Sequence, residues 1–194
     1  MNKEKLGERY NNKGWDLQNG LTTGASDPYA AIEWYEKAVE CCNSTAMVNL
    51  GNIYEDREDF EKAYYWYLKA ALADNEQGMF NVANMHFRRW HVPQDYQKAY
   101  QYFAKLNELG VEGTNYYLGL YAENGYLGEP DYEKAKDCYA KGIEEGDIYC
   151  PVNLGRMYCL GLGGPVDYQK GFDLYYQGYP RPAARACWSS VADA

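Results

Sequence analysis

The sequence contains little of what nucleic-acid-binding and membrane proteins need. The formal net charge is −9, and the longest basic run is the pair Arg88-Arg89. Nucleic acid and anionic lipid both attract clustered Lys and Arg, so we expect neither as a partner. No apolar run approaches the roughly 20 residues of a membrane helix. The first residues are polar and contain no hydrophobic signal core, so we expect a cytoplasmic protein.

Catalytic and metal-binding motifs are equally scarce. The chain has only 2 histidines, and no Ser or Cys lies in a neighbourhood that suggests an activated nucleophile. The glycine cluster at residues 161–164 lacks the lysine and the preceding strand of a phosphate-binding loop. Histidines and cysteines show no zinc spacing. We therefore predict no catalytic residue, no metal and no cofactor.

A five-residue motif that recurs at long intervals dominates the rest of the sequence. Its best copy is Asp-Tyr-Glu-Lys-Ala at residues 131–135, and successive copies begin 32, 36, 36 and 36 residues apart. The copies begin at Asp27, Asp59, Asp95, Asp131 and Asp167. A period of this size is typical of a repeat array, in which each unit is one supersecondary element that cannot bury its apolar face alone.

A second motif precedes each aspartate, and its anchor is a small residue. The anchors are Gly14, Gly51, Ala83, Gly119 and Gly155. The step from anchor to aspartate is 13, 8, 12, 12 and 12 residues, so the second unit has a shorter internal loop. Each unit therefore reads as a first helix (the A helix), a loop and a second helix (the B helix).

Local signals support these helix pairs. Aspartate is a good N-cap, because its carboxylate accepts N–H groups of the first turn. The B helices are predicted to stop near Asn43, Asn75, Gly110 and Gly146, residues that tolerate the left-handed conformation. One B-helix position is aromatic in every unit, and a small residue lies four positions before it on the same face. The aromatic residues are Tyr35, Tyr67, Phe103, Tyr139 and Tyr175.

Glycines inside the A helices need a reason, because each costs about 1 kcal/mol relative to alanine. Close approach of the A and B helices of one unit would offset this cost. We therefore predict that Gly51, Gly119 and Gly155 lie at the contact between the two helices of their own unit.

The cysteines do not recur with the repeat. They are Cys41, Cys42, Cys138, Cys150, Cys159 and Cys187. Six is an even number, but a repeat protein held by disulfides would place a pair in every unit. Reduced thiols in a reducing compartment are the simpler interpretation.

The two motifs together resemble the Sel1-like repeat, a relative of the tetratricopeptide repeat. The best copies are Leu50-Gly51 to Tyr54 with residues 66–71, and Leu154-Gly155 to Gly161 with residues 167–170. The resemblance implies an all-α fold, an α-solenoid in which antiparallel helix pairs form a right-handed superhelix with A helices on its concave side. It also implies a non-enzymatic adaptor or scaffold in protein complexes.

We expect one domain over residues 1–194. The predicted repeats span 5–42, 43–74, 75–110, 111–146 and 147–180, and residues 181–194 form a partial repeat or a cap.

The A helices are predicted to line a groove for a protein or an extended peptide. Two polar positions, three residues apart, share one face of each A helix. The predicted contacts are Asn49, Asn52, Asn81, Asn84, Tyr117, Asn153 and Arg156. Asparagine offers a donor and an acceptor, so it suits a peptide backbone. The simpler alternative is that these asparagines are solvated helix surface.

Three further alternatives stand beside this prediction, and the first two come from the resemblance. Related tetratricopeptide domains hold a peptide carboxylate with asparagines that match Asn52 and Asn81, but Val48, Gly113 and Tyr117 replace the cations this needs. Some disulfide-rich relatives have been suggested to be hydrolases. The chain could also be an interaction module of a longer regulatory protein.

The third internal loop, residues 88–93, combines Arg88, Arg89 and Trp90 with His91. It is either a loop whose tryptophan packs on its own helix pair or an exposed aromatic and cationic contact. His86 falls at the position of Tyr54 and Tyr158, which predicts a packed helix residue.

Overall fold

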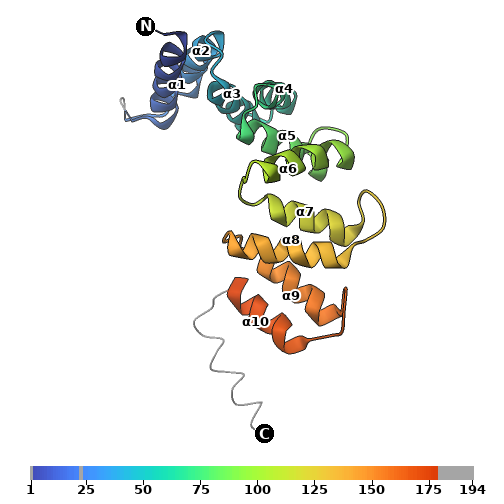
Figure 1. Ribbon diagram of the computed structural model, residues 1–194. Coiled ribbons are helices and arrows are strands. Elements are labelled where there is room, and N and C mark those ends of the chain that lie inside the picture. Colours follow the sequence, from blue (N-terminus) through green and yellow to red (C-terminus); the bar gives the residue numbers. More distant parts are fainter. Residues whose placement is uncertain (1, 22–23, 179–194) are drawn as a thin grey trace. The chain divides into compact units, whose positions relative to one another are not determined.

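A computed structural model describes residues 2–21 and 24–178, and these residues form ten α-helices and no strand (Figure 1). The helices are α1 (Lys3–Asn19), α2 (Pro28–Glu40), α3 (Ser44–Asp56), α4 (Phe60–Leu72), α5 (Glu76–Arg88), α6 (Tyr96–Glu108), α7 (Thr114–Asn124), α8 (Tyr132–Glu144), α9 (Cys150–Leu160) and α10 (Tyr168–Gly178). Odd-numbered helices are the predicted A helices and even-numbered ones the B helices. The predicted cap, residues 181–194, lies outside the described residues.

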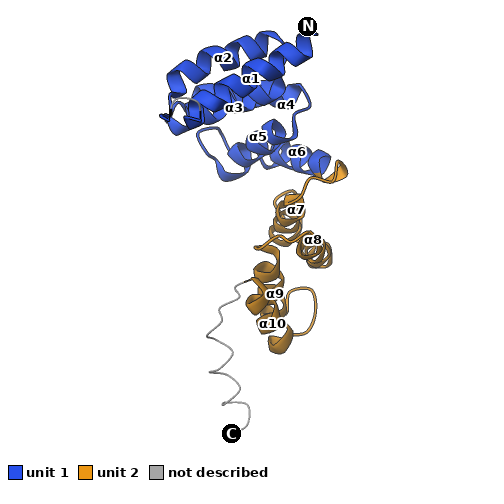
Figure 2. Cartoon of the chain, turned by 90° about the vertical axis from the view of Figure 1, so that its left-hand side faces the viewer, with its two compact units in different colours: residues 1–106 blue, residues 107–194 orange. Residues whose placement is uncertain are grey.

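The chain divides into two compact units, which Figure 2 colours separately. Unit 1 covers residues 1–106 and contains α1 to α5 and most of α6, and unit 2 begins at residue 107 and contains α7 to α10. Within unit 1, α1 packs on α2, α2 on α3, α3 on α4 and α4 on α5. Within unit 2, α7 packs on α8, α8 on α9 and α9 on α10. Helix pairs that stack in chain order are an α-solenoid, so the predicted fold class is confirmed.

The aspartates of the recurring motif start the B helices as predicted. Each carboxylate accepts a backbone N–H from the first turn, at 2.9 to 3.3 Å. These hydrogen bonds satisfy donors that have no partner inside the helix. The same N-cap interaction therefore starts the B helix of all five repeats.

Helices α2 and α4 end close to Asn43 and Asn75, as predicted, but neither asparagine is the left-handed residue. The left-handed residues are Cys42 (φ 64°) and Asp74 (φ 56°). Asn43 and Asn75 instead start the next A helices, where their side chains accept the N–H of Ala46 and Gly78. Asparagine suits both positions, and the short link between helices decides between them. Gly110 and Gly146 are left-handed as predicted.

The predicted contact between A and B helices of one unit is confirmed. Tyr35, Tyr67, Phe103 and Tyr139 are at most 1% exposed. A Cβ atom at Gly14 would lie 2.8 Å from the ring of Tyr35. At Gly51 and Gly119 a Cβ would overlap the ring of the aromatic residue opposite, and at Gly155 it would meet the backbone of α10. At Gly14, Gly51 and Gly119 the anchor must be small because the aromatic ring occupies the space of its side chain.

Candidate functional site

A polar pocket lies in unit 1 at the predicted asparagines of α3. Its volume is about 620 Å³. We call it the α3–α5 pocket, and its walls are Ser44, Thr45, Val48, Asn49, Asn52 and the segment Asp74–Gln77. A concave site with several polar side chains is where a binding function is expected. The pocket therefore brings Asn49 and Asn52 together in one site.

Most amide groups of this pocket are held by a neighbour. Asn49 Nδ2 donates to Asn11 Oδ1 at 2.9 Å, and Gln77 Nε2 donates to Asn81 Oδ1 at 3.1 Å. The hydroxyl of Tyr67 lies 2.8 Å from Asn52 Oδ1. These hydrogen bonds restrict the amide orientations before any ligand arrives, which lowers the entropy cost of binding.

The other predicted contacts of unit 1 are less available. Asn81 is partly buried and already bonded to Gln77. Asn84 is also partly buried, and its Oδ1 has no hydrogen-bond partner in the described part of the chain. Neither residue lines the α3–α5 pocket. Of the predicted asparagines in unit 1, Asn49 and Asn52 therefore line the pocket, and Asn81 and Asn84 do not.

In unit 2 the predicted contacts have mainly internal partners. Tyr117 is only 6% exposed, so it offers little surface to a ligand. Asn153 Nδ2 donates to the backbone oxygen of Tyr149 at 2.9 Å. Arg156 Nη2 donates to Asn153 Oδ1 at 3.3 Å and also pairs with Glu123. The side chain of Arg156 is still 42% exposed, so it can reach a ligand.

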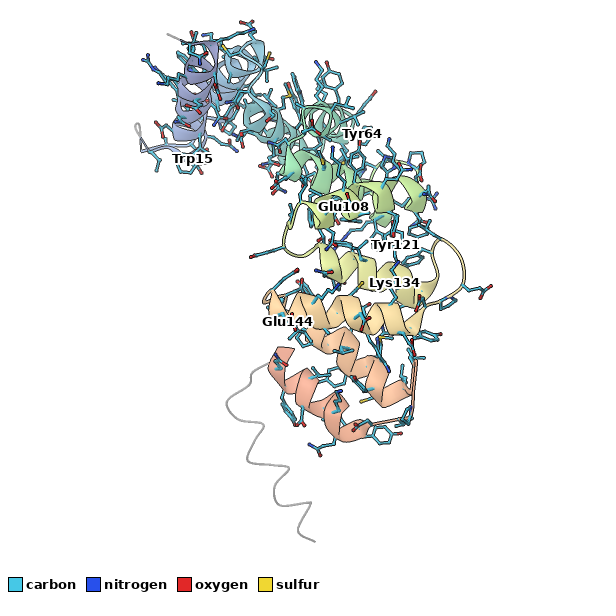
Figure 3. All side chains as sticks on the ribbon, in the orientation of Figure 1. Trp15, Tyr64, Glu108, Tyr121, Lys134 and Glu144 are labelled. Atoms are coloured by element: carbon cyan, nitrogen blue, oxygen red, sulfur yellow. The ribbon has the colours of Figure 1, made fainter. Side chains whose placement is uncertain are left out.

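Two residues of α1 were missed, although the signal was available. Asn12 and Trp15 stand at the same offsets from the anchor Gly14 as Asn49 and Asn52 from Gly51. Asn12 lines a hollow of about 330 Å³, whose other walls are Arg9, Lys13, Asp16 and Leu17. Trp15 is 49% exposed on the same helix (Figure 3). Applying the same two offsets to Gly14, the anchor of the first repeat, would have found both residues.

A buried carboxylate in unit 2 was also missed. Glu123 is 5% exposed and lies at the end of α7. Arg156 Nη2 lies 2.6 Å from its Oε1, and the hydroxyl of Tyr139 donates to its Oε2 at 2.8 Å. Burial and the Glu123 carboxylate raise the pKa of Tyr139, so this hydroxyl keeps its proton. Glu123 therefore links α7, α8 and α9.

The sequence holds a signal for this contact in the residue four positions after each anchor. In the first four repeats, this residue offers an oxygen acceptor where the B helix has tyrosine, and it is phenylalanine where the B helix has phenylalanine. The pairs are Gln18 with Tyr35, Glu55 with Tyr67, Phe87 with Phe103 and Glu123 with Tyr139. A buried hydroxyl needs an acceptor and a phenyl ring does not, which explains the correlated change. The fifth repeat has Cys159 with Tyr175 and departs from this pattern.

The loop at residues 88–93 packs on the start of α4. The ring of His91 stacks on Phe60, with centroids 3.3 Å apart and an angle of 4°. Trp90 lies 6.1 Å from the same ring and remains 43% exposed. Arg88 and Arg89 are exposed. Trp90 therefore packs on α4 of the preceding repeat instead of on its own helix pair. A contact of this loop with a partner stays a prediction.

His86 is a packed residue of α5, as predicted. It is 6% exposed, and its Nδ1 lies 3.1 Å from the backbone oxygen of Pro93. A carbonyl oxygen only accepts, so Nδ1 carries the proton and Nε2 accepts from Tyr64 at 3.0 Å. The same hydroxyl accepts from Lys98 Nζ at 2.8 Å. Burial, with a smaller contribution from Lys98, lowers the pKa of His86 against the opposing effects of the hydrogen bond to Pro93 and of Asp95.

This arrangement predicts a stability loss at mildly acidic pH. The pKa of His86 is lower in the folded chain than its ordinary 6.5, so below pH 6.5 the unfolded state binds the proton more readily. We expect the free energy of unfolding to fall as pH drops from 7 towards 5.5, by less than about 1.4 kcal/mol per pH unit. Urea unfolding across this range should show a flatter profile for His86→Gln. His91→Gln is the control and should keep the wild-type profile; identical profiles for all three proteins would contradict the assignment.

Catalytic and metal chemistry finds little support in the described residues. They contain no group of three or more His, Cys, Asp or Glu side chains placed to hold a metal ion. Cys138 and Cys150 are buried free thiols, and burial raises the pKa of both, so they stay protonated. Cys187 lies outside the described residues. None of the described helices combines the length and the apolar composition needed to cross a membrane.

Comparison with protein-family models matches the chain to the Sel1 repeat. The matched segments are residues 14–41, 44–75, 77–111, 114–147 and 152–179. No curated protein sequence matches the chain.

Solved structures with the same fold include other repeat proteins of this kind. A Sel1 repeat protein from Oxalobacter formigenes is 26% identical, with a TM-score of 0.78, and the match covers 90% of this chain and 72% of that one. A protective antigen of uropathogenic Escherichia coli displaying an SLR fold is also 26% identical, with a TM-score of 0.75. That match covers 95% of this chain and 39% of the antigen. An immunity protein from Pseudomonas aeruginosa, 18% identical with a TM-score of 0.52 over 92% of this chain and 68% of that one, shares the fold alone.

Proposed function

Because this chain belongs to the Sel1 repeat family, we propose that it is a non-enzymatic scaffold that binds an extended segment of a partner protein on its A helices. Sel1 repeats are typically non-enzymatic scaffolds for protein–protein interaction. A cytoplasmic location and a single functional domain over residues 1–194 remain predictions. The partner is a protein or a peptide, and no cofactor is required.

The α3–α5 pocket is the observation that carries this proposal. It is concave, it is lined mainly by amide, hydroxyl and carboxylate side chains, and its amides are already oriented by Asn11, Asn81 and Tyr67. An extended peptide has one N–H and one C=O at every residue, so it pairs with such side chains. Shared polar contacts along a preformed surface are a common way to recognise a segment of a partner.

Other surfaces supplement the pocket in this proposal. In unit 2, Arg156 presents an exposed guanidinium beside Asn153. In unit 1, Trp15 and Trp90 are large side chains that are nearly half exposed. Exposed tryptophan and arginine often dominate binding energy at protein interfaces. Each unit therefore has its own candidate contacts.

A triple substitution tests the proposal. We expect Asn49→Ala, Asn81→Ala and Asn153→Ala together to reduce capture of the native partner about 100-fold. Each change removes a hydrogen bond to the partner or one that orients Gln77 or Arg156, at about 1 kcal/mol each. Capture is measured by cross-linking in a lysate of the native host, followed by quantitative mass spectrometry. Alanine favours helices, so the fold should persist.

The matched control removes three amides from B helices. Gln97, Gln101 and Gln177 are exposed on α6 and α10, and their replacement by alanine should leave capture unchanged. Circular dichroism confirms that both triple variants keep the wild-type helix content. If the asparagine variant captured its partner as well as the control does, the A-helix surface would not be the binding site.

A further inference from the structure

The α3–α5 pocket presents more hydrogen-bond acceptors than donors. Asn49 uses an N–H of its amide for Asn11, and Gln77 uses one for Asn81. Each of these amides keeps one further N–H and its oxygen, and the oxygen has two lone pairs for a ligand. The amide of Asn75 is used internally, since its oxygen accepts from Gly78 N and its nitrogen donates to Ser44. The pocket thus shows amide oxygens from two of its walls.

Asn52 supplies a third amide oxygen to the pocket. The reason is that Asn52 and Glu55 compete for the single hydroxyl proton of Tyr67. The hydroxyl of Tyr67 lies 2.8 Å from Asn52 Oδ1 and 2.5 Å from Glu55 Oε2. Tyrosine has a single proton, and a carboxylate can only accept. Burial and Glu55 raise the pKa of Tyr67, so the proton stays on the hydroxyl and points to Glu55. Turning the Asn52 amide by 180° lets Nδ2 donate to the phenolic oxygen and leaves Oδ1 for the pocket.

The charges around the pocket favour a cation. Among its nine wall residues there is no Lys or Arg, whereas Asp74 and Glu76 carry carboxylates. Lys105 offsets the charge of Asp74, with Nζ 2.7 Å from Oδ1, and Glu76 is exposed. The positive ends of α3 and α5 also face this region, but Asn43 and Asn75 already occupy the N–H groups of Ala46 and Gly78.

We infer that the α3–α5 pocket binds the side chain of an arginine in the partner segment. A guanidinium has five N–H donors and no acceptor, which complements the amide oxygens of Asn49, Asn52 and Gln77 and the carboxylate of Glu76. Val48 contributes an apolar surface for the methylene stem. This inference rests on the proposed function, and it assigns the chemistry of the ligand at one position.

Peptides that differ at one side chain test the inference. The probes are three acetylated and amidated octapeptides, identical except for a central arginine, citrulline or glutamate. They are titrated into the full-length ¹⁵N-labelled chain and followed by NMR. We expect the arginine peptide to bind at least about tenfold more tightly than the citrulline peptide, which has the same shape without the charge. The backbone and side-chain amide signals of Asn49 and Asn52 should shift with it.

Two variants locate the effect in the pocket. Glu76→Gln should reduce the preference for arginine over citrulline several-fold. Glu61→Gln is its matched control, because both glutamates are exposed in the first turn of a helix and only Glu76 lines the pocket. Asn49→Lys, which places a cation among the acceptors, should abolish binding of the arginine peptide.

The outcomes separate this inference from the proposed function. Equal affinity for the arginine and citrulline peptides, tighter binding of the glutamate peptide, or no binding of the arginine peptide at about 5 mM would overturn it. None of these results affects capture of the native partner. Undiminished capture by the asparagine triple variant would instead overturn the proposed function, whatever the peptide preference.

Discussion

Replacing Gly119 by leucine is expected to lower the free energy of unfolding by about 3 kcal/mol. Gly119 lies inside α7 against the ring of Tyr139 on α8, and even a Cβ atom there would overlap that ring. Tyr139 is 0% exposed, so the ring has no free space to enter. Overpacking of a tight core typically costs 1–3 kcal/mol. Urea unfolding followed by circular dichroism measures the change.

Smaller substitutions check that overpacking is the cause. Gly119→Ala should destabilise by about 1 kcal/mol, although alanine is the better helix former by a similar amount. Gly128→Ala is the control, because no atom lies within 4 Å of a Cβ at that loop position, and it should have the stability of the wild type. Combining Gly119→Ala with Tyr139→Leu should cost less than the sum of the two single changes. Additive costs, or an unchanged Gly119→Leu protein, would reject the contact.

Replacing Arg156 by methionine is expected to destabilise the chain by about 2 kcal/mol at pH 7. Arg156 is the cation that pairs with the buried carboxylate of Glu123. Removing it leaves that carboxylate with the hydroxyl of Tyr139 as its remaining partner in the described part of unit 2. Stranding a buried charge costs up to 3–5 kcal/mol, and the 42% exposure of Arg156 reduces this because water can approach.

The double variant identifies the stranded charge as the cause. Glu123→Gln is neutral and can still accept from Tyr139, so Glu123→Gln with Arg156→Met should recover most of the loss. Lys105→Met is the control: it breaks the exposed Lys105–Asp74 pair of unit 1, and it should have no measurable effect. Stability of the double variant below that of Arg156→Met would contradict the prediction, as would an equal loss in Lys105→Met.

The candidate site was partly predictable. The offset from each anchor placed Asn49 and Asn52 on one face of an A helix, and both line the α3–α5 pocket. Tyr117 has the same offset from Gly119 as Asn49 has from Gly51, yet Tyr117 is buried. An offset states which side of a helix a residue occupies. Whether that side faces solvent depends on the neighbouring elements, which the offset does not describe.

The periodic sequence by itself determined the helix pairs, their order, the aspartate caps and the pairing of small anchors with aromatic rings. These features depend on helical geometry and on residues close in the chain, so each repeat encodes them again. Only the tertiary structure decided that Asn43 starts a helix, that Asn11 turns the amide of Asn49, and that Arg156 pairs with Glu123. The last two contacts join residues 38 and 33 positions apart, and such contacts exist only when separate helix pairs have stacked.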